Sequence, residues 1–141
     1  MTIKEKKSQG QLTKGEGLVL VVDDEPIMRK IAVNVLKSCG YEVMVAEDGD
    51  IAVEIFAKNY QKIKLVLLDL LMPRKSGKET YIEMKQIQPD VNVLLVSGAK
   101  KDERIKELLK TGVKAYLEKP YTFSHLSRLV HKLIYKEDKK A

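Results

Sequence analysis

The chain has 141 residues, of which 44% are hydrophobic, and its formal net charge is +6 at pH 7. No apolar run approaches the roughly 20 residues that a membrane helix needs, and the first residues lack the apolar centre of a secretory signal. The single cysteine, Cys39, excludes an internal disulfide. These features predict one folded domain in the cytoplasm, without a membrane segment.

The positive charge is concentrated at the two ends of the sequence. Residues 1–17 carry four Lys and two Glu, and residues 132–141 carry four Lys and two acids, so the ends together hold +4 of the +6. Residues 18–131 carry 18 basic and 16 acidic side chains, without a basic helical stripe interleaved with aromatic residues. We therefore expect no direct binding of nucleic acid, which needs a concentrated basic surface.

Five aliphatic runs alternate along the chain with five segments of helical periodicity, which predicts a parallel sheet with helices on both faces. Residues 1–17 are polar and contain Gly, so we expect a flexible leader or linker remnant there. The folded domain is expected at 18–135, followed by a short basic tail at 136–141. Strands are expected near 18–22, 41–46, 65–69, 91–96 and 113–117, and helices near 27–39, 51–59, 77–87, 102–111 and 122–135.

Polar side chains follow four of these five strands. Asp23 and Asp24 come after the first strand, and Asp69 ends the third. Ser97 follows the fourth strand and Lys119 the fifth. Because the carboxyl ends of parallel strands meet at one edge of a sheet, we expect all five side chains to lie close together. Three carboxylates in one crevice repel one another unless a cation lies among them, and such oxygen ligands suit Mg²⁺ or Mn²⁺.

These groups together suit the transfer of a phosphoryl group. A cation, an ammonium group and a hydroxyl neutralise its oxygens, and Lys119 and Ser97 supply the last two. One carboxylate is then left to accept the group, and Asp69 has the central position for that role. Taken one at a time, the residues have simpler interpretations. The aspartates can cap a helix, Ser97 can lie in a turn, and Lys119 with Pro120 can form a surface turn.

At these residues the chain resembles the receiver domain of two-component response regulators, the CheY-like superfamily. The resemblance covers about residues 18–135. It implies an α/β, doubly wound (βα)5 fold of the flavodoxin-like kind, a three-layer sandwich with a five-stranded parallel sheet in the order 2-1-3-4-5. The motifs that carry it are Asp23-Asp24, Asp69 in Asp-Leu-Leu-Met-Pro-Arg-Lys-Ser-Gly, Ser97-Gly98, Tyr116 and Lys119-Pro120.

The resemblance also implies a chemistry for the acidic residues. Asp69 would be phosphorylated by a histidine kinase or by a histidine phosphotransfer protein. Mg²⁺ would be bound by Asp24, by Asp69 and by the backbone carbonyl of Leu71, while Asp23 would hold a metal-bound water. The domain would then be a signalling switch rather than a conventional enzyme, although it would catalyse its own phosphorylation and dephosphorylation.

A switch is implied for the residues that follow the last two strands. Ser97 and Lys119 would contact the phosphoryl oxygens, Tyr116 would turn inward on activation, and the bond from Lys119 to Pro120 would be cis. The surface of the fourth helix, fifth strand and fifth helix would then dock a downstream protein or a second copy. We expect no output domain after Ile134, so the chain is a single-domain regulator, a relay intermediate or the receiver of a hybrid histidine kinase.

Three other interpretations compete with the receiver, because fold alone does not decide function. A flavin-binding protein is disfavoured because the first loop is acidic rather than suited to a phosphate. Mg²⁺-dependent aspartate-nucleophile phosphohydrolases resemble one another in having a second acid two residues after the nucleophile. This chain has Leu71 at that position, which disfavours this interpretation. A degenerate receiver that only binds partners would lack an acidic residue or the lysine, and none is lost here.

Overall fold

The computed structural model describes residues 12–98 and 103–135. The predicted tail at 136–141, most of the predicted leader and the expected start of the fourth helix at Asp102 lie outside these ranges. In chain order the elements are β1 (Leu18–Val22), α2 (Pro26–Cys39), β2 (Glu42–Ala46), α3 (Gly49–Asn59), β3 (Ile63–Asp69), α4 (Gly77–Ile87), β4 (Val93–Ser97), α5 (Glu103–Thr111), β5 (Ala115–Glu118) and α6 (Phe123–Ile134).

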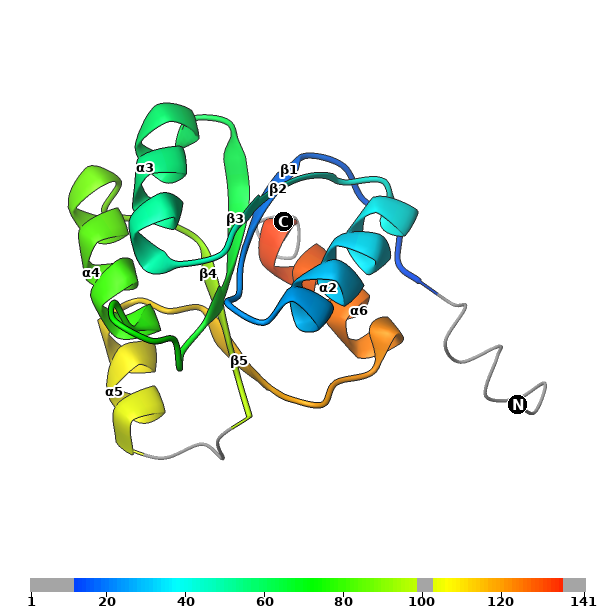
Figure 1. Cartoon of the computed structure of the whole chain (residues 1–141). Helices are drawn as coiled ribbons and strands as arrows, with labels where there is room; N and C mark the ends of the chain where they lie inside the picture. The colour runs from blue at the N-terminus through cyan, green and yellow to red at the C-terminus, as the bar shows by residue number, and fades with distance from the viewer. Residues whose placement is uncertain (1–11, 99–102, 136–141) are drawn as a thin grey trace.

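The five strands form one parallel sheet in the order β2-β1-β3-β4-β5. Helices α3, α4 and α5 cover one face of the sheet, and α2 and α6 cover the other (Figure 1). The expected three-layer, doubly wound fold is therefore confirmed. Within the described residues, no helix combines the length and the apolar character that crossing a membrane requires.

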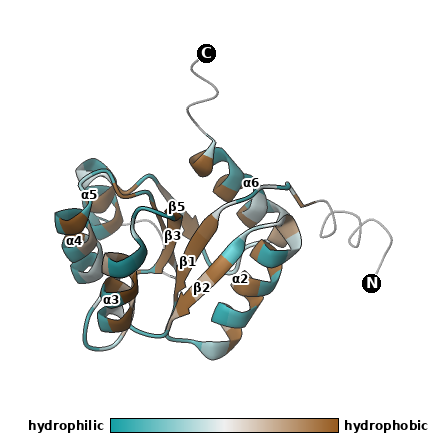
Figure 2. Ribbon diagram, turned by 90° about the horizontal axis from the view of Figure 1, so that it is seen from above, coloured by the Kyte–Doolittle hydropathy of each residue, from teal (hydrophilic) through white to brown (hydrophobic). Residues whose placement is uncertain are grey.

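Strand residues alternate between two cores, one on each face of the sheet. In β1, Leu20 and Val22 face α3, α4 and α5, whereas Val19 and Val21 face α2 and α6. Because both faces are covered, the strands are apolar at nearly every position, and Figure 2 shows them as the hydrophobic centre between helices with polar outer sides. Each fully buried aliphatic side chain contributes about 1.5–3 kcal/mol. The two cores hold the strands in place, and with them the strand ends at which the polar residues gather.

Local signals set the helix ends and so shape the loops at that edge. Helix α2 begins with Pro26, and it ends at Gly40, whose φ of 114° suits a residue without a Cβ. Helix α4 begins with a capping box, in which Ser76 and Glu79 each accept a hydrogen bond from the other's backbone N–H. Every helix that follows a strand thus begins at the carboxyl edge of the sheet and runs back to the amino edge.

Residues 12–17, which we call the N-terminal strap, pack against α2 and α6 rather than projecting from the domain. Leu12 packs beside the α2 and α6 core. The flexible leader predicted for residues 1–17 therefore stays a prediction only for residues 1–11, which the structure does not describe. The strap's hydrogen bonds run from Thr13 N to Ser127 Oγ (3.1 Å), from Gly15 N to Cys39 O (3.0 Å), from Glu16 N to Tyr135 Oη (3.0 Å) and from Glu42 N to Gly17 O (2.8 Å).

The strap covers two side chains at the end of α2. Tyr41 is 3% exposed, and its buried hydroxyl has no hydrogen-bond partner among the described residues, while the thiol of Cys39 is buried beside it. Gly15 lies so close to Tyr41 that a Cβ on Gly15 would collide with the phenol ring. Burial raises the pKa of Tyr41 to about 12, with smaller contributions from Tyr135 and Cys39. This corner is closely packed.

Candidate functional site

Three carboxylates gather at the carboxyl edge of the sheet. Asp23 and Asp24 follow β1 and Asp69 ends β3, and one oxygen from each lies within 4.8 Å of the others. Asp23 and Asp69 are 7% and 5% exposed. Three carboxylates this close, offering only oxygen, fit a small hard cation such as Mg²⁺. The sequence predicted this grouping from the strand ends alone.

Strand register explains why these carboxylates meet. Val22 of β1 pairs with Leu68 of β3, so the next residue of each strand, Asp23 and Asp69, lies at the same level. The N–H of Asp23 donates to the carbonyl of Ala46 (3.2 Å), which continues the ladder with β2 by one residue. The backbone of the sheet, rather than a flexible loop, therefore sets the distance between the two buried acids.

Lys119 reaches into this cluster from the end of β5. Its Nζ lies 3.0 Å from Asp23 Oδ2, 3.2 Å from Glu25 Oε1 and 3.6 Å from Asp69 Oδ2. Burial lowers the pKa of Lys119, but its hydrogen bond to Asp23 and the charge of Asp69 outweigh burial, so the pKa is raised. The ammonium group is therefore charged at neutral pH. The bond from Lys119 to Pro120 is cis, as expected.

The electrostatic environment of Asp69 is unusual for a carboxyl group. Burial raises its pKa from 3.8 to about 7; Lys119 opposes this rise, and the charges of Asp23 and Asp24 add to it. The N–H of Leu71 donates to the same carboxylate and lowers the pKa slightly. Displaced pKa values of this kind, caused by burial beside like charges, are typical of functional sites.

Ser97 lies beside Asp69 on the neighbouring strand β4, and Tyr116 lies one strand further, on β5. Val96 of β4 pairs with Asp69, and Ser97 follows it as the fully buried last residue of β4. The hydroxyl of Tyr116 on β5 donates to the carbonyl of Ser97 (3.3 Å). The structure thus brings the expected hydroxyl residue to the site and links the expected switch tyrosine to it through the backbone.

The loop from Leu70 to Ser76 returns closely past the site. The N–H of Leu70 donates to Val96 O (2.9 Å), and the N–H of Gly77 donates to Leu70 O (2.8 Å). A Cβ on Gly77 would collide with the backbone carbonyl of Asp69, so glycine is needed where α4 begins. The Leu71 side chain is 50% exposed, and its backbone is therefore held beside the acids by its neighbours rather than by its own burial.

Sequence reasoning missed two further residues around Asp23. The carboxylate of Glu25 contacts Lys119, and Arg29 Nη1 donates to the carbonyl of Asp23 (2.7 Å). The N–H of Glu25 also donates to Asp23 Oδ1 (2.9 Å). The third acid of Asp-Asp-Glu was the only available signal, and in sequence it is indistinguishable from a turn residue before a helix.

Comparison with known proteins agrees with this geometry. The chain is 30% identical over 118 residues to the chemotaxis protein CheY of Thermotoga maritima, an alignment that covers 82% of this chain and 95% of that protein. It is 31% identical over 136 residues to the sensor kinase CckA of Brucella abortus, covering 96% of this chain but only 14% of the kinase. The chain therefore spans about one seventh of that relative.

A solved structure gives the same result. The response regulator protein TrrA of Thermotoga maritima, in complex with Mg²⁺ and BeF, is 32% identical with a TM-score of 0.73, and the match covers 83% of this chain and 98% of that one. The family model described as the response regulator receiver domain matches residues 19–131. The chain thus belongs to the response regulator receiver domain family, the signalling switches of two-component systems.

Proposed function

We propose that Asp69 is the residue of this receiver that accepts a phosphoryl group. The observation that carries the proposal is the position of Asp69 among two other carboxylates and one ammonium group, that of Lys119. Asp69 is the member of the acidic cluster that ends β3, the strand next to β4, and its Oδ2 lies 3.6 Å from the Nζ of Lys119, which follows β5. That position lets an incoming phosphoryl group contact a cation on one side and protein donors on the other.

We propose Mg²⁺ as the cofactor, with Mn²⁺ as a substitute. Asp24, Asp69 and the backbone carbonyl of Leu71 would hold the ion, and Asp23 would hold one of its waters. When bound, Mg²⁺ would supply positive charge that offsets the repulsion among the acids and lowers the pKa of Asp69. The support is the chemistry of the donors, since three carboxylates within 4.8 Å favour a hard divalent cation.

The remaining residues position and neutralise the phosphoryl group. A carboxylate oxygen of Asp69 attacks phosphorus while the bond from phosphorus to the donor's leaving atom breaks, and the leaving group departs with that electron pair. Lys119, already 3.6 Å from Asp69, turns its ammonium group to one phosphoryl oxygen. The hydroxyl of Ser97 donates to another. A similar arrangement with no cation would leave the acids repelling the incoming anion.

We further propose that phosphorylation is read out on the surface formed by α5, β5 and α6. Movement of Ser97 toward the phosphoryl group would shift its carbonyl, which accepts the hydrogen bond from Tyr116. Tyr116 would then turn inward and change that surface, where a downstream protein or a second copy docks. The upstream partner is a histidine kinase or a histidine phosphotransfer protein, acting in the cytoplasm, and the receiver itself is not a conventional enzyme.

Asp69→Asn tests the acceptor directly. Wild type incubated with acetyl phosphate and Mg²⁺ should gain one phosphoryl group, located on Asp69 by mass spectrometry after borohydride reduction, and Asp69→Asn should gain none. Asp90→Asn is the matched control, because Asp90 is exposed and lies at the opposite edge of the sheet. Phosphate found on another residue, or on Asp69→Asn, would refute the assignment.

The metal site has its own test. Asp24→Ala should weaken Mg²⁺ binding at least tenfold, because it removes one of three carboxylates from the cluster. NMR titration with Mg²⁺ measures the affinity in the absence of any phosphoryl donor. Equal affinities in Asp24→Ala and wild type would place the ion elsewhere.

A further inference from the structure

Glu25 lies at the N-terminus of α2, but its side chain does not cap the helix. It is the N-cap residue of α2, yet its side chain accepts no hydrogen bond from that helix. Its backbone is fixed instead by the N–H bond to Asp23 Oδ1 and by Pro26, which favours the extended conformation seen at Glu25. The carboxylate is thereby directed to Lys119, with Oε1 3.2 Å from Nζ.

Lys119 lies closer to Asp23 and Glu25 than to Asp69, although it contacts all three carboxylates. The distances from Nζ are 3.0 Å to Asp23 and 3.2 Å to Glu25, against 3.6 Å to Asp69. In the described part of the chain, the group of acids that converges within reach of one ion contains Asp23, Asp24 and Asp69 and does not include Glu25. Glu25 therefore adds negative charge at the site without belonging to the group that a cation would neutralise.

We propose that Glu25 is a specificity-determining residue, which slows phosphorylation of Asp69 by small anionic donors and favours donors with less negative charge. This inference rests on the proposed role of Asp69 as the acceptor. Lys119 must exchange Glu25 for a phosphoryl oxygen, and the freed carboxylate, 61% exposed at the mouth of the site, then repels the donor. The repulsion grows in proportion to the charge of the donor.

Two small donors that differ in charge separate this electrostatic effect from a structural one. At neutral pH acetyl phosphate is a dianion and phosphoramidate a monoanion. In both reactions Asp69 forms a bond to phosphorus. Acetate leaves with the electrons of the broken P–O bond in the first, and ammonia leaves with those of the broken P–N bond in the second. Glu25 acts through electrostatic repulsion, so the difference between the donors that it can affect is their net charge.

The experiment measures the phosphorylation rates of wild type and Glu25→Gln with each donor, at Mg²⁺ concentrations that saturate each variant. We expect Glu25→Gln to accelerate the reaction with acetyl phosphate by roughly threefold to tenfold, and the reaction with phosphoramidate by a clearly smaller factor. Raising the ionic strength should shrink the difference between donors, because salt screens an exposed charge. Glu25→Asp, which keeps the charge, should retain the wild-type ratio of the two rates.

Glu47→Gln is the matched control. It removes an exposed carboxylate that also follows a strand at the carboxyl edge, and the ion pairs of Lys119 do not include Glu47. Its donor ratio should equal that of wild type. A second readout without donor is Mg²⁺ affinity by NMR, which Glu25→Gln should weaken less than Asp24→Ala does.

The outcomes distinguish this inference from the function on which it rests. If wild type is phosphorylated on Asp69 but Glu25→Gln leaves the donor ratio unchanged, Glu25 has no electrostatic role. If Glu25→Gln is slower with both donors, Glu25 positions Lys119 productively and the inference is wrong. If neither donor modifies Asp69 in wild type, the proposed acceptor itself fails.

Discussion

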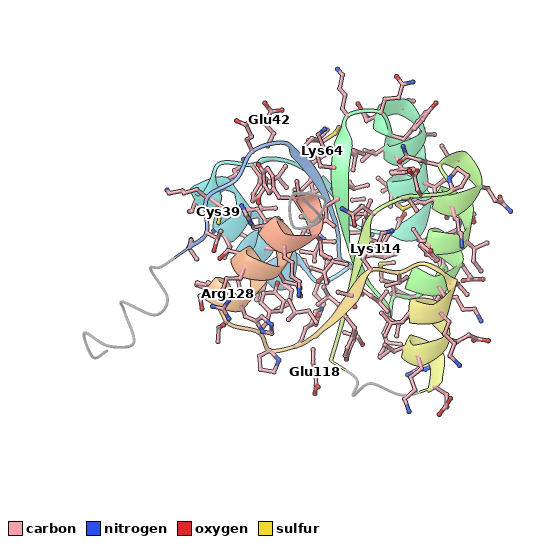
Figure 3. The ribbon with its side chains drawn as sticks, turned by 180° about the vertical axis from the view of Figure 1, so that it is seen from behind. Cys39, Glu42, Lys64, Lys114, Glu118 and Arg128 are labelled. Atoms are coloured by element: carbon pink, nitrogen blue, oxygen red, sulfur yellow. The ribbon has the colours of Figure 1, made fainter. Side chains whose placement is uncertain are left out.

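The two edges of the sheet differ in how their polar groups are arranged. At the carboxyl edge, the carboxylates of Asp23, Glu25 and Asp69 all contact the ammonium group of Lys119, with Asp24 close by. At the amino edge, the N-terminal strap pairs its backbone with α2 and α6. Figure 3 labels Glu42 and Lys64 at the amino edge and Glu118 at the opposite one.

The carboxyl edge carries the groups for function, whereas the amino edge carries contacts that stabilise the fold. Repulsion among buried acids costs folding free energy that a cation or a phosphoryl group with its cation can relieve, whereas the strap makes contacts that need no ligand. We therefore expect loss of a charge at the carboxyl edge to stabilise the ligand-free protein, and loss of a contact at the amino edge to destabilise it.

The largest effect is expected for Asp69→Asn in the presence of a chelator. The variant should raise the free energy of unfolding by about 2–4 kcal/mol at pH 8, because it removes a buried charge beside two others. The folded pKa of about 7 exceeds the ordinary 3.8, so the folded state binds the proton more tightly. Wild-type stability should therefore fall as pH rises from about 4 to 7 and then level off, while Asp69→Asn lacks this fall.

Urea unfolding of both proteins across this pH range measures the effect, with Asp90→Asn as the control for loss of an exposed aspartate. An unchanged or lower stability of Asp69→Asn at pH 8 would mean that the acids at the carboxyl edge are not in conflict.

Gly40→Ala should have the next largest effect, in the opposite direction. Its φ of 114° is strained for any residue with a Cβ, and that Cβ would collide with the carbonyl of Gly15 in the strap. We expect a loss of about 2–3 kcal/mol in the free energy of unfolding. Gly98→Ala is the control, because a Cβ there would meet no atom of the described residues within 4 Å. Equal stability of the two variants would show that the strap is not closely packed on α2.

A smaller effect is expected for Tyr41→Phe, and only at alkaline pH. Burial raises the pKa of Tyr41 from 10 to about 12, so the unfolded state loses its proton first and wild-type stability falls as pH rises through this interval. At pH 11 the variant should be about 1 kcal/mol more stable than wild type. At pH 8 the two should be nearly equal, because within residues 12–98 and 103–135 the hydroxyl has no hydrogen-bond partner to lose. A difference that is the same at both pH values would contradict this reasoning.

The smallest effect is expected for Ser127→Ala, which removes the acceptor for the N–H of Thr13. The cost should be about 0.5–1 kcal/mol. Hydrogen exchange gives the sharper measurement, since the Thr13 amide should exchange faster in the variant while amides in β3 stay protected. An unchanged rate at Thr13 would indicate that the strap is held by its other contacts.

Much of this architecture follows from local patterns in the sequence. The first strand and the helix at 77–87 lie at the predicted residues, because each has an unambiguous boundary, such as the Ser76 cap. The third strand begins earlier than predicted, at Ile63, since the exposed Lys64 interrupts its apolar run without ending the strand. The acidic cluster was predictable because strand ends in a parallel sheet share one edge.

The contacts that were not predictable join residues far apart in the sequence. Nothing local to Thr13 or Glu16 indicates that their amides are satisfied by side chains of Ser127 and Tyr135 more than a hundred residues later. The same is true of Glu25, whose contact with Lys119 depends on where β5 ends. Periodicity describes which face of an element is buried, but it does not specify which distant side chain meets a given backbone group.

The reciprocal bonds between Glu16 and Tyr135 also set where the polypeptide enters and leaves the domain. The N–H of Glu16 donates to Tyr135 Oη, and that hydroxyl lies 3.4 Å from the carbonyl of Glu16. Entry and exit therefore share one corner at the amino edge, on the far side of the sheet from Asp69. A domain connected in this way can be spliced into a surface loop of a host protein without forcing the two ends of that loop apart.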